Sequence, residues 1–209
     1  MTASFRQIPI LLATTNPGKL REFKALLAAE LAKYPVYCLE DLPAIAAPEE
    51  DGDSFFANAR IKALYYSQSF PGMLVVAEDS GLEVRALGNE PGIRSARFAG
   101  EPFSDQRNIR LLLQRLEHAE DRGARFVTEA VLARDGRVLF HCRREVNGTI
   151  LKSPRGKRGF GYDPVFYYPP LQKSFAELEA VEKNAVSHRG RAMQDVSEFL
   201  CLEMRKSSD

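Results

Sequence analysis

Residues 73–77 are all apolar, and Glu78 and Asp79 follow them directly. A run of this kind predicts a strand in a sheet that helices cover on both faces. We therefore expect two carboxylates at the end of a buried strand. Adjacent ionised carboxylates repel each other unless a cation or a proton joins them. Because no His or Cys is nearby, oxygen ligands indicate a hard ion, for which magnesium beside phosphate is the usual case.

Two other interpretations of these carboxylates stay open on the sequence alone. The end of a solvated loop would carry Glu78 and Asp79 equally well, and so would the cap of a helix. A further oxygen ligand could come from the acidic loop that contains Glu49. Such a ligand would help to complete a site for a divalent cation.

A second strand pattern, over residues 8–13, leads directly into a polar turn and a helix pattern. The turn consists of Thr14, Thr15, Asn16, Pro17, Gly18 and Lys19. Asn16 is a good N-cap and Pro17 suits the first helical position, so the turn offers oriented N–H donors, a favourable dipole and a mobile cation to a polyphosphate. A Walker P-loop would need Gly at Ala13 and Ser or Thr at Leu20, and is excluded. A plain capped helix start is the alternative.

The rest of the chain alternates between helix and strand patterns. We expect helices over residues 55–68, after Ser104, after Ser174 and after Ser187, and strands over residues 82–87, 125–134, 137–146 and 165–168. Asp135 and Gly136 are a preferred pair for a tight hairpin, which adds an antiparallel pair of strands to the strand-turn-helix unit. The predicted fold is therefore α/β with a mixed sheet. Lys62 lies on the inward face of its helix.

An aromatic segment in the last third of the chain combines ring faces, a flexible backbone and a carboxylate. It consists of Phe160, Gly161, Tyr162 and Asp163. These groups suit stacking on a base and hydrogen bonding to its edge, although aromatic residues before a strand more often belong to a core. We interpret the four cations in residues 152–158 as a solvated loop. His188 and Arg189 follow the cap Ser187 and place two donors at another helix start.

The composition restricts the partners of the protein. Its 209 residues predict one domain over residues 1–209, and 29 Lys and Arg against 28 Asp and Glu leave a net charge of +1, too little to attract nucleic acid or anionic lipid. The three cysteines form no CxxC pair, which excludes a thiolate zinc site and fits a reducing compartment. No apolar run approaches the ~20 residues of a membrane span. We expect a cytoplasmic protein without a nucleic-acid or membrane partner.

Taken together, these segments resemble the inosine triphosphate pyrophosphatase family, which includes the XTP/dITP diphosphatases. The resemblance extends over nearly the whole chain, and its motifs keep one order. They are residues 14–19, the helix at residues 55–63, Glu78 to Gly81, Pro91-Gly92, Ser95 to Arg97, Gly159 to Pro164 and Glu182 to Arg189. Two departures are Glu78, where many bacterial members have Asp, and Thr15, where Gly is common.

The resemblance implies a role for each matching residue. It assigns the triphosphate to residues 14–19 and Ser80, proton abstraction to Asp79, and Mg²⁺ to Glu49 and Asp79 with Glu78 in support. Lys19 and Lys62 would stabilise charge on the phosphates. The base would lie among Phe160, Gly161, Tyr162, Asp163, Lys183, His188 and Arg189, where Arg189, Lys183 or N–H groups near Gly161 would donate to its 6-keto oxygen.

The resemblance also implies an elongated, twisted mixed sheet with flanking helices, two lobes and a central cleft, in a homodimer. The implied activity is Mg²⁺-dependent hydrolysis of a purine nucleoside triphosphate (ITP, dITP or XTP) to the monophosphate and pyrophosphate, which cleanses the nucleotide pool. The sequence does not rank these substrates. Two alternatives are a nucleotide- or RNA-binding module without turnover and a pyrophosphatase specific for modified pyrimidine nucleotides. The carboxylates argue against the first, because anions beside a phosphate site weaken binding when no metal is present.

Overall fold

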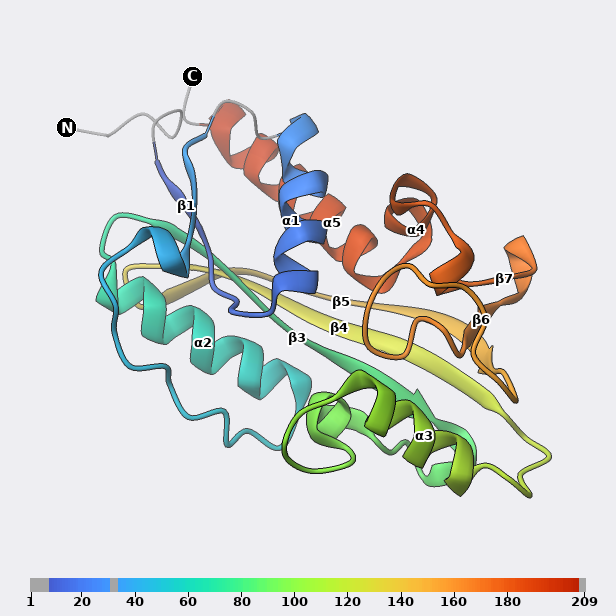
Figure 1. Ribbon diagram of the computed structural model, residues 1–209. Coiled ribbons are helices and arrows are strands. Elements are labelled where there is room, and N and C mark those ends of the chain that lie inside the picture. Colours follow the sequence, from blue (N-terminus) through green and yellow to red (C-terminus); the bar gives the residue numbers. More distant parts are fainter. Residues whose placement is uncertain (1–7, 31–33, 207–209) are drawn as a thin grey trace. The chain divides into compact units, whose positions relative to one another are not determined.

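The computed structural model describes residues 8–30 and 34–206 (Figure 1). The helices are α1 (Pro17–Glu30), α2 (Phe55–Ser69), α3 (Asp105–Arg115), α4 (Ala180–Val186) and α5 (His188–Lys206). The strands are β1 (Ile10–Leu12), β2 (Val36–Cys38), β3 (Leu74–Val84), β4 (Gly123–Arg134), β5 (Arg137–Ile150), β6 (Phe166–Tyr168) and β7 (Lys173–Ser174). Short 3-10 helices include η4 (Gly92–Arg97) and η6 (Phe175–Glu177).

Within the described residues, seven strands pair in the order β2-β1-β3-β4-β5-β6-β7. Strand β1 is parallel to β2 and to β3, whereas β6 is antiparallel to β5 and to β7. The predicted mixed sheet with flanking helices is therefore confirmed. The chain divides into two compact units, which we call unit 1 (residues 1–79, 129–143 and 189–209) and unit 2 (residues 80–128 and 144–188). The single domain over residues 1–209 stays a prediction.

Unit 1 is organised by the alternation of side chains along its strands. Leu74 and Val76 of β3 belong to one core cluster, which includes Phe23 of α1 and Val196 of α5. Val75 and Ala77 belong to a second cluster, which includes Ala59 and Ala63 of α2. Successive strand residues point to opposite faces, so α1 and α5 cover one face of this part of the sheet and α2 covers the other (Figure 1). Both faces are apolar, as predicted.

Unit 2 has a core of its own. Leu112 of α3, Phe126 of β4 and Phe166 of β6 are members of this core cluster, together with Phe175 of η6. The rings of Phe126 and Phe166 lie 4.6 Å apart between centroids, and those of Phe166 and Phe175 lie 4.8 Å apart. These aromatic contacts pack β6 and η6 together with β4 in the core of unit 2.

Several local predictions are confirmed at their boundaries. Helix α2 begins after Ser54, whose Oγ accepts a hydrogen bond from Ala57 N, and α3 begins after Ser104. The hairpin between β4 and β5 turns at Asp135 and Gly136, both with positive φ. Positive φ at both positions is what a tight hairpin turn of this kind requires. Helix α4 and strand β2 were not predicted, because both are short and carry no periodic apolar pattern.

The prediction for β3 was wrong in one respect. The strand does not stop at Glu78, and residues 82–87 do not start a new strand, because β3 continues without interruption from Leu74 to Val84. Acidic residues lower β propensity, yet the strand stays extended through them beyond Val76, where its pairing with β1 ends. The two carboxylates therefore lie within a strand, where they must point to opposite faces.

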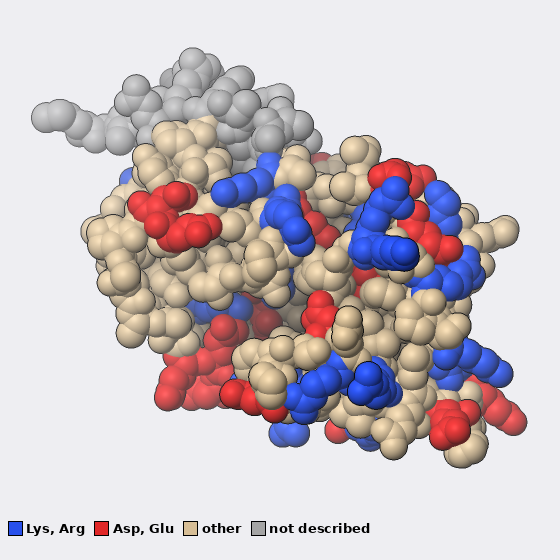
Figure 2. All heavy atoms as spheres, viewed as in Figure 1, with Lys and Arg blue, Asp and Glu red and all other residues tan. Residues whose placement is uncertain are grey.

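The surface carries both signs of charge. Figure 2 shows Lys and Arg side chains interspersed with Asp and Glu side chains across the face in view. This distribution agrees with the formal net charge of +1. Among the described helices, none combines the length and the apolar character needed to cross a membrane.

Candidate functional site

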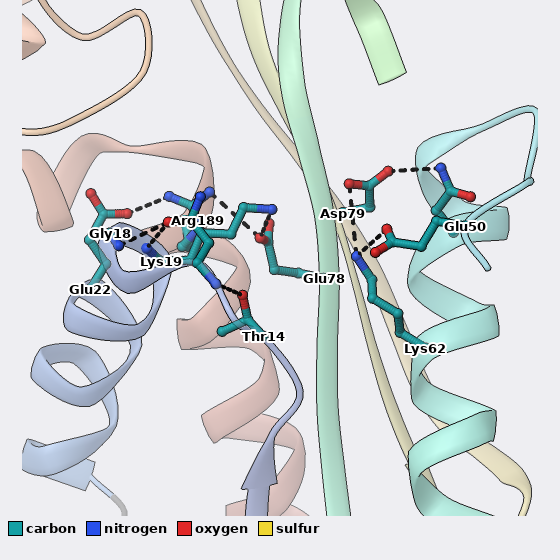
Figure 3. A network of polar contacts seen from close by, with 11 residues as sticks. Thr14, Gly18, Lys19, Glu22, Glu50, Lys62, Glu78, Asp79 and Arg189 are labelled. Carbon is teal, nitrogen blue, oxygen red and sulfur yellow. Dashed lines mark hydrogen bonds and ion pairs between the residues drawn. The ribbon is translucent and has the colours of Figure 1, made fainter. Parts of the chain in front are cut away.

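Glu78 and Asp79 are adjacent in β3 and extend from opposite sides of the strand (Figure 3). Glu78 continues the face of Leu74 and Val76, which α1 and α5 cover, and Asp79 continues the face that α2 covers. The ion-pair partners of the two carboxylates therefore differ, with Lys19 and Arg189 beside Glu78 and Lys62 beside Asp79. Alternation separates the two side chains, although burial and, to a lesser degree, the charge of Glu78 raise the pKa of Asp79.

The Glu78 side chain is fully buried and lies in a cluster of charges. Its Oε1 is 2.5 Å from Lys19 Nζ and 3.6 Å from Arg189 Nη2. Arg189 also pairs with Glu22 of α1, and only 3% of the Arg189 side chain is exposed. Two cations and two carboxylates thus hold together the start of α1, the start of α5 and the middle of β3 (Figure 3).

Asp79 has a different environment. Its Oδ2 accepts a hydrogen bond from Asn58 Nδ2 at 3.2 Å, and its Oδ1 lies 4.0 Å from Lys62 Nζ. Lys62 donates to Glu50 at 2.7 Å, so its ammonium group lies between two carboxylates. Burial raises the pKa of Asp79, and Lys62 and Lys19 oppose this effect only in part. A carboxylate with a raised pKa and a nearby cation is suited to accept a proton at moderate pH.

The carboxylates near Lys62 could hold a metal ion only if a bound phosphate or water supplied further oxygen donors. Among the residues that the structure describes, no three His, Cys, Asp or Glu side chains form a group that could enclose an ion. Asp79 and Glu50 both approach Lys62, whereas Glu49 is exposed. Mg²⁺ is commonly held by one or two carboxylates and completed by substrate phosphates and water, and such a partial donor set is present here. The predicted ligand role of Glu49 stays a prediction.

The predicted phosphate turn forms the connection from β1 to α1. Asn16 Oδ1 accepts hydrogen bonds from the N–H groups of Gly18, at 2.9 Å, and Lys19, at 3.1 Å. Asn16 N in turn donates to Thr14 Oγ1 at 3.2 Å. Asn16 is therefore the N-cap, as predicted, and it engages two of the donors that a phosphate could use. Thr15 and Pro17 are exposed at the tip of the turn.

The aromatic segment of unit 2 is built around a buried carboxylate. Asp163 Oδ2 accepts a hydrogen bond from Phe160 N at 2.9 Å and pairs with Lys183, which α4 supplies. Lys183 Nζ also lies 4.9 Å from the centre of the Phe160 ring. A Cβ on Gly159 would lie 2.0 Å from Asp163 Oδ2, so only Gly leaves room for this carboxylate. The structure thus brings Phe160, Asp163 and Lys183 together, as predicted.

Tyr162, Gly161 and His188 are held by other residues of unit 2. Tyr162 is 4% exposed, and its hydroxyl donates to Ser95 O at 2.9 Å. Burial strongly raises the pKa of this hydroxyl, which keeps it a donor. Gly161 N donates to Asp105 Oδ2 at 2.6 Å, so the donor that we expected to face a base is engaged by a side chain. The His188 ring stacks on Phe126, with centroids 4.8 Å apart.

Two residues of the polar networks were missed in the sequence. Asn58 contacts Asp79, and Glu22 contacts Arg189. Asn58 could have been found, because it precedes Lys62 by one helical turn and therefore shares its face of α2. Glu22 carries no comparable signal, since its role depends on a contact between distant parts of the chain. Glu50 belongs to the acidic loop that we expected to supply a further ligand, and its contact with Lys62 was not predicted. Ser80, a predicted phosphate contact, is the first residue of unit 2.

Comparisons with known proteins agree with these motifs. Residues 10–199 match the model of the Ham1 family. A protein of Acidobacterium capsulatum named dITP/XTP pyrophosphatase is 47% identical over 195 residues, which cover 90% of this chain and 95% of the relative. A protein of the same name from Thermus thermophilus is 45% identical over 196 residues and covers 92% of both chains.

Solved structures show the same fold. The Ham1 protein of Staphylococcus aureus has a TM-score of 0.83 at 38% identity, over 93% of this chain and 99% of that one. A nucleoside-triphosphatase / dITP/XTP pyrophosphatase of Mycobacterium abscessus has a TM-score of 0.70 at 39% identity, over 90% and 97% of the two chains. The predicted family is confirmed by these matches: the chain belongs to the Ham1 family.

Proposed function

We propose that the protein hydrolyses the triphosphates of deaminated purine nucleosides, ITP, dITP and XTP, to the monophosphate and pyrophosphate. The observation that carries this proposal is the arrangement around β3. Two lysines, Lys19 and Lys62, approach adjacent carboxylates from opposite faces of one strand, and one of these carboxylates has a raised pKa. The dITP/XTP pyrophosphatases of Acidobacterium capsulatum and Thermus thermophilus support the substrate class.

Asp79 is the residue that we assign to proton abstraction. Asn58 fixes one of its oxygens by a hydrogen bond at 3.2 Å, which orients the carboxylate toward a water. Burial raises the pKa of Asp79, which strengthens the carboxylate as a base. The water would attack the α-phosphorus, and its proton would pass to Asp79. The bond between the α-phosphorus and the bridging oxygen of pyrophosphate would break.

Lys19 and Lys62 would stabilise the charge that develops on the phosphates. Lys19 belongs to the first turn of α1, where the helix dipole also favours an anion. Glu78 holds Lys19 at 2.5 Å and Glu50 holds Lys62 at 2.7 Å, so each ammonium group is positioned before a substrate arrives. Positioned cations of this kind reduce the reorganisation that charge stabilisation requires.

Asp79, with Glu49 or Glu50, would hold a Mg²⁺ ion together with the phosphates. A bound Mg²⁺ supplies charge neutralisation on the phosphates and lowers the pKa of a water. We assign Glu78 to the positioning of Lys19 instead of metal binding, because it points away from Asp79 across the strand (Figure 3). The ion pair between Lys62 and Glu50 would lengthen when the ammonium group of Lys62 binds the phosphates.

The base would be bound by the aromatic segment of unit 2. Phe160 is half-buried and could stack on any purine. Lys183, whose Nζ lies 4.9 Å from the centre of the Phe160 ring, and His188 are buried donors of the same unit. Donors at this position match the 6-keto oxygen of hypoxanthine and xanthine and mismatch the 6-amino group of adenine. Arg189 pairs with Glu22 and Glu78, so we give it a smaller part in base selection than the sequence suggested.

A binding module for RNA is less well supported. Arg155 pairs with Glu177, and Arg158 pairs with Glu179, so two cations of the loop before Phe160 are neutralised by partners in the same unit. Mixed charge across the visible face gives no single basic patch there (Figure 2). We also propose that the protein is a homodimer, as the family resemblance implies, and sedimentation velocity would test this. A cytoplasmic location is proposed from the cysteine pattern, which fits a reducing compartment.

A panel of nucleoside triphosphates tests the proposed function. Each substrate is incubated with Mg²⁺ or with EDTA, and pyrophosphate and orthophosphate are measured separately. We expect pyrophosphate from ITP, dITP and XTP, much less from ATP and GTP, and none in EDTA. Orthophosphate as the first product would contradict the proposal. Preferential turnover of modified pyrimidine nucleotides would favour the second enzymatic alternative.

A further inference from the structure

We propose that Asp105 is a positioning residue that holds the turn of residues 160–163 in the conformation that binds the base. The proposal rests on the proposed function of that turn and extends it to a residue that no motif singled out. Asp105 is the first residue of α3, and its Oδ2 accepts a hydrogen bond from Gly161 N at 2.6 Å. The contact joins two segments that are 56 positions apart in the chain.

Gly161 is the residue of the turn whose backbone needs such support. Its φ is +59°, in the left-handed region, and an added Cβ would meet no atom within 4 Å. Packing therefore does not enforce the left-handed conformation at this position. A backbone hydrogen bond from Asp163 N to Phe160 O at 3.2 Å closes the turn, and the carboxylate of Asp105 adds a constraint from outside it, because it fixes the direction of the Gly161 N–H group. A charged acceptor at 2.6 Å makes a stronger hydrogen bond than a neutral one.

A second residue of helix α3, Asn108, is linked to the turn indirectly, through the carbonyl oxygen of Ser95. Asn108 Nδ2 donates to Ser95 O at 3.3 Å and to Ala96 O at 2.9 Å. Ser95 O also accepts the hydrogen bond from the Tyr162 hydroxyl at 2.9 Å. Asp105 and Asn108 are three residues apart, so they share one face of the helix. Two consecutive residues of the turn, Gly161 and Tyr162, are thus tied to the same face of α3.

The local electrostatics favour a carboxylate at this position. Ser104 caps α3 through a hydrogen bond from Arg107 N to its Oγ, and Asp105 is the acidic residue of the first turn. The partial positive charge at a helix start stabilises an anion there. The N–H group of Phe160 donates to Asp163, and the N–H group of the next residue, Gly161, donates to Asp105. The backbone on both sides of the Phe160 side chain is therefore held by a hydrogen bond.

Loss of the Asp105 contact should reduce affinity for the base and leave the phosphate chemistry unchanged. With Gly161 released, the turn can leave its left-handed conformation, and Phe160 loses its fixed position for stacking. The groups proposed for proton abstraction and phosphate binding, Asp79, Lys19 and Lys62, all belong to unit 1, whereas Asp105 and the turn belong to unit 2. A positioning role therefore predicts a change in KM with little change in kcat.

The test compares Asp105→Ala, Asp105→Asn and Gln106→Ala, where Gln106 is an exposed neighbour in the same helical turn. Asn keeps a side-chain oxygen that can accept the bond from Gly161 N but removes the charge. We expect Asp105→Ala to raise KM for ITP about tenfold, the effect of one lost hydrogen bond. We expect kcat to change less than about twofold, Asp105→Asn to recover most of the affinity, and Gln106→Ala to resemble the wild type.

Tripolyphosphate, which has no base, serves as the second probe. Its inhibition constant should be the same for all variants, because it does not use the turn. Amide hydrogen exchange at Gly161, followed by NMR, should be faster in Asp105→Ala than in the wild type and in Asp105→Asn. This exchange is measured without substrate, and it therefore tests the contact even if the wild type hydrolyses no nucleotide.

Three results would overturn the inference. Unchanged KM and unchanged exchange at Gly161 in Asp105→Ala would show that the contact does not hold the turn. A parallel loss of kcat and of tripolyphosphate inhibition would show a general defect of the fold. An equal rise in KM for Gln106→Ala would assign the effect to the helix. Absence of pyrophosphate release in the wild type would instead contradict the proposed function.

Discussion

Glu78 and Asp79 show how two adjacent carboxylates can acquire different tasks. The Glu78 side chain has no exposed surface and faces Lys19 and Arg189, whereas 14% of the Asp79 side chain is exposed and its nearest cation, Lys62, is 4.0 Å away. Glu78 is thus well compensated and holds a lysine in place. Asp79 is compensated only in part, and its raised pKa is the physical basis of its proposed role as a base.

The substitution Asp79→Asn should separate activity from stability. We expect kcat to fall at least ~100-fold, since the proton acceptor is lost, with a smaller change in KM. We expect the melting temperature of the metal-free protein to rise, because Asn removes a buried charge and can still accept the bond from Asn58. Kinetics with ITP and thermal unfolding in EDTA measure the two effects. Full activity, or a lower melting temperature, would contradict these roles.

The stability gain of Asp79→Asn should depend on pH in a defined direction. Burial raises the pKa of Asp79 in the folded protein above its value in the unfolded chain. The ionised carboxylate therefore costs stability at pH values above the folded pKa, and this cost disappears as the pH falls toward the unfolded pKa. The difference in melting temperature between the variant and the wild type should shrink in acid. A difference that grows in acid would mean that the native environment favours the ionised form.

Lys19→Ala and Lys62→Ala should differ in stability as well as in kinetics. Lys19→Ala removes one of the two cations that pair with buried Glu78 and should cost at least ~2 kcal/mol of unfolding free energy. Lys62→Ala releases Glu50, whose side chain is 42% exposed, and should cost less than ~1 kcal/mol. Lys19→Ala should also raise KM more, because Lys19 belongs to the phosphate-binding turn.

The matched control is the double variant Lys19→Ala with Glu78→Gln. Removal of the Glu78 charge should restore most of the lost stability without restoring KM. Urea unfolding and steady-state kinetics give both quantities. If Lys62→Ala raised KM more than Lys19→Ala did, the assignment of Lys19 to the bound triphosphate would have to be given up.

At the scale of elements, the sequence predicted local structure well and strand continuity poorly. The caps Asn16 and Ser104, the start of α2 at Phe55 and the Asp135-Gly136 hairpin were predicted correctly, because each depends on a few adjacent residues. The continuous strand β3 was predicted as two strands. Strand β3 lies between β1 and β4 in the sheet, and β1 pairs only with its first part, Leu74 to Val76. The sequence of β3 contains no information about these neighbours.

The candidate site was predicted in its residues more than in its contacts. Sequence motifs singled out Lys19, Asp79 and Lys62 as site residues. In the structure, Lys19 Nζ lies 2.5 Å from Glu78 Oε1, and Lys62 Nζ lies 4.0 Å from Asp79 Oδ1. The engagement of Arg189 by Glu22 did not follow, since these residues are 167 positions apart. Period-two alternation along β3 would have placed Glu78 and Asp79 on opposite faces, had the strand been read as continuous.

The turn before β6 allows a matched comparison of two glycines. Gly159 and Gly161 both have positive φ, but an added Cβ at Gly159 would lie 2.0 Å from Asp163 Oδ2, whereas Gly161 has open space. Gly161→Ala should therefore cost only ~1 kcal/mol of conformational strain. Gly159→Ala should cost more and should raise KM further, because it also displaces Asp163 from Lys183. Equal costs in urea unfolding would show that the Asp163 contact does not limit this position.

At the scale of the whole molecule, the charge distribution favours a small anionic substrate over a polyanion. The net charge is +1, and the cations Arg155 and Arg158 are paired with carboxylates. The cations that we assign to the ligand, Lys19 and Lys62, form a small local set, and a carboxylate holds each of them in place. A small local set of cations suits a triphosphate, whose affinity depends on a few contacts rather than on a long basic surface.

Hydrolysis of ITP in ¹⁸O-labelled water tests the central claim most directly. One water activated by Asp79 should attack the α-phosphorus of each ITP. We therefore expect a single ¹⁸O atom in the inosine monophosphate, unlabelled pyrophosphate, and no inosine diphosphate at any time. Mass spectrometry of the products during one turnover measures all three quantities. Label in orthophosphate, with accumulation of the diphosphate, would contradict the account.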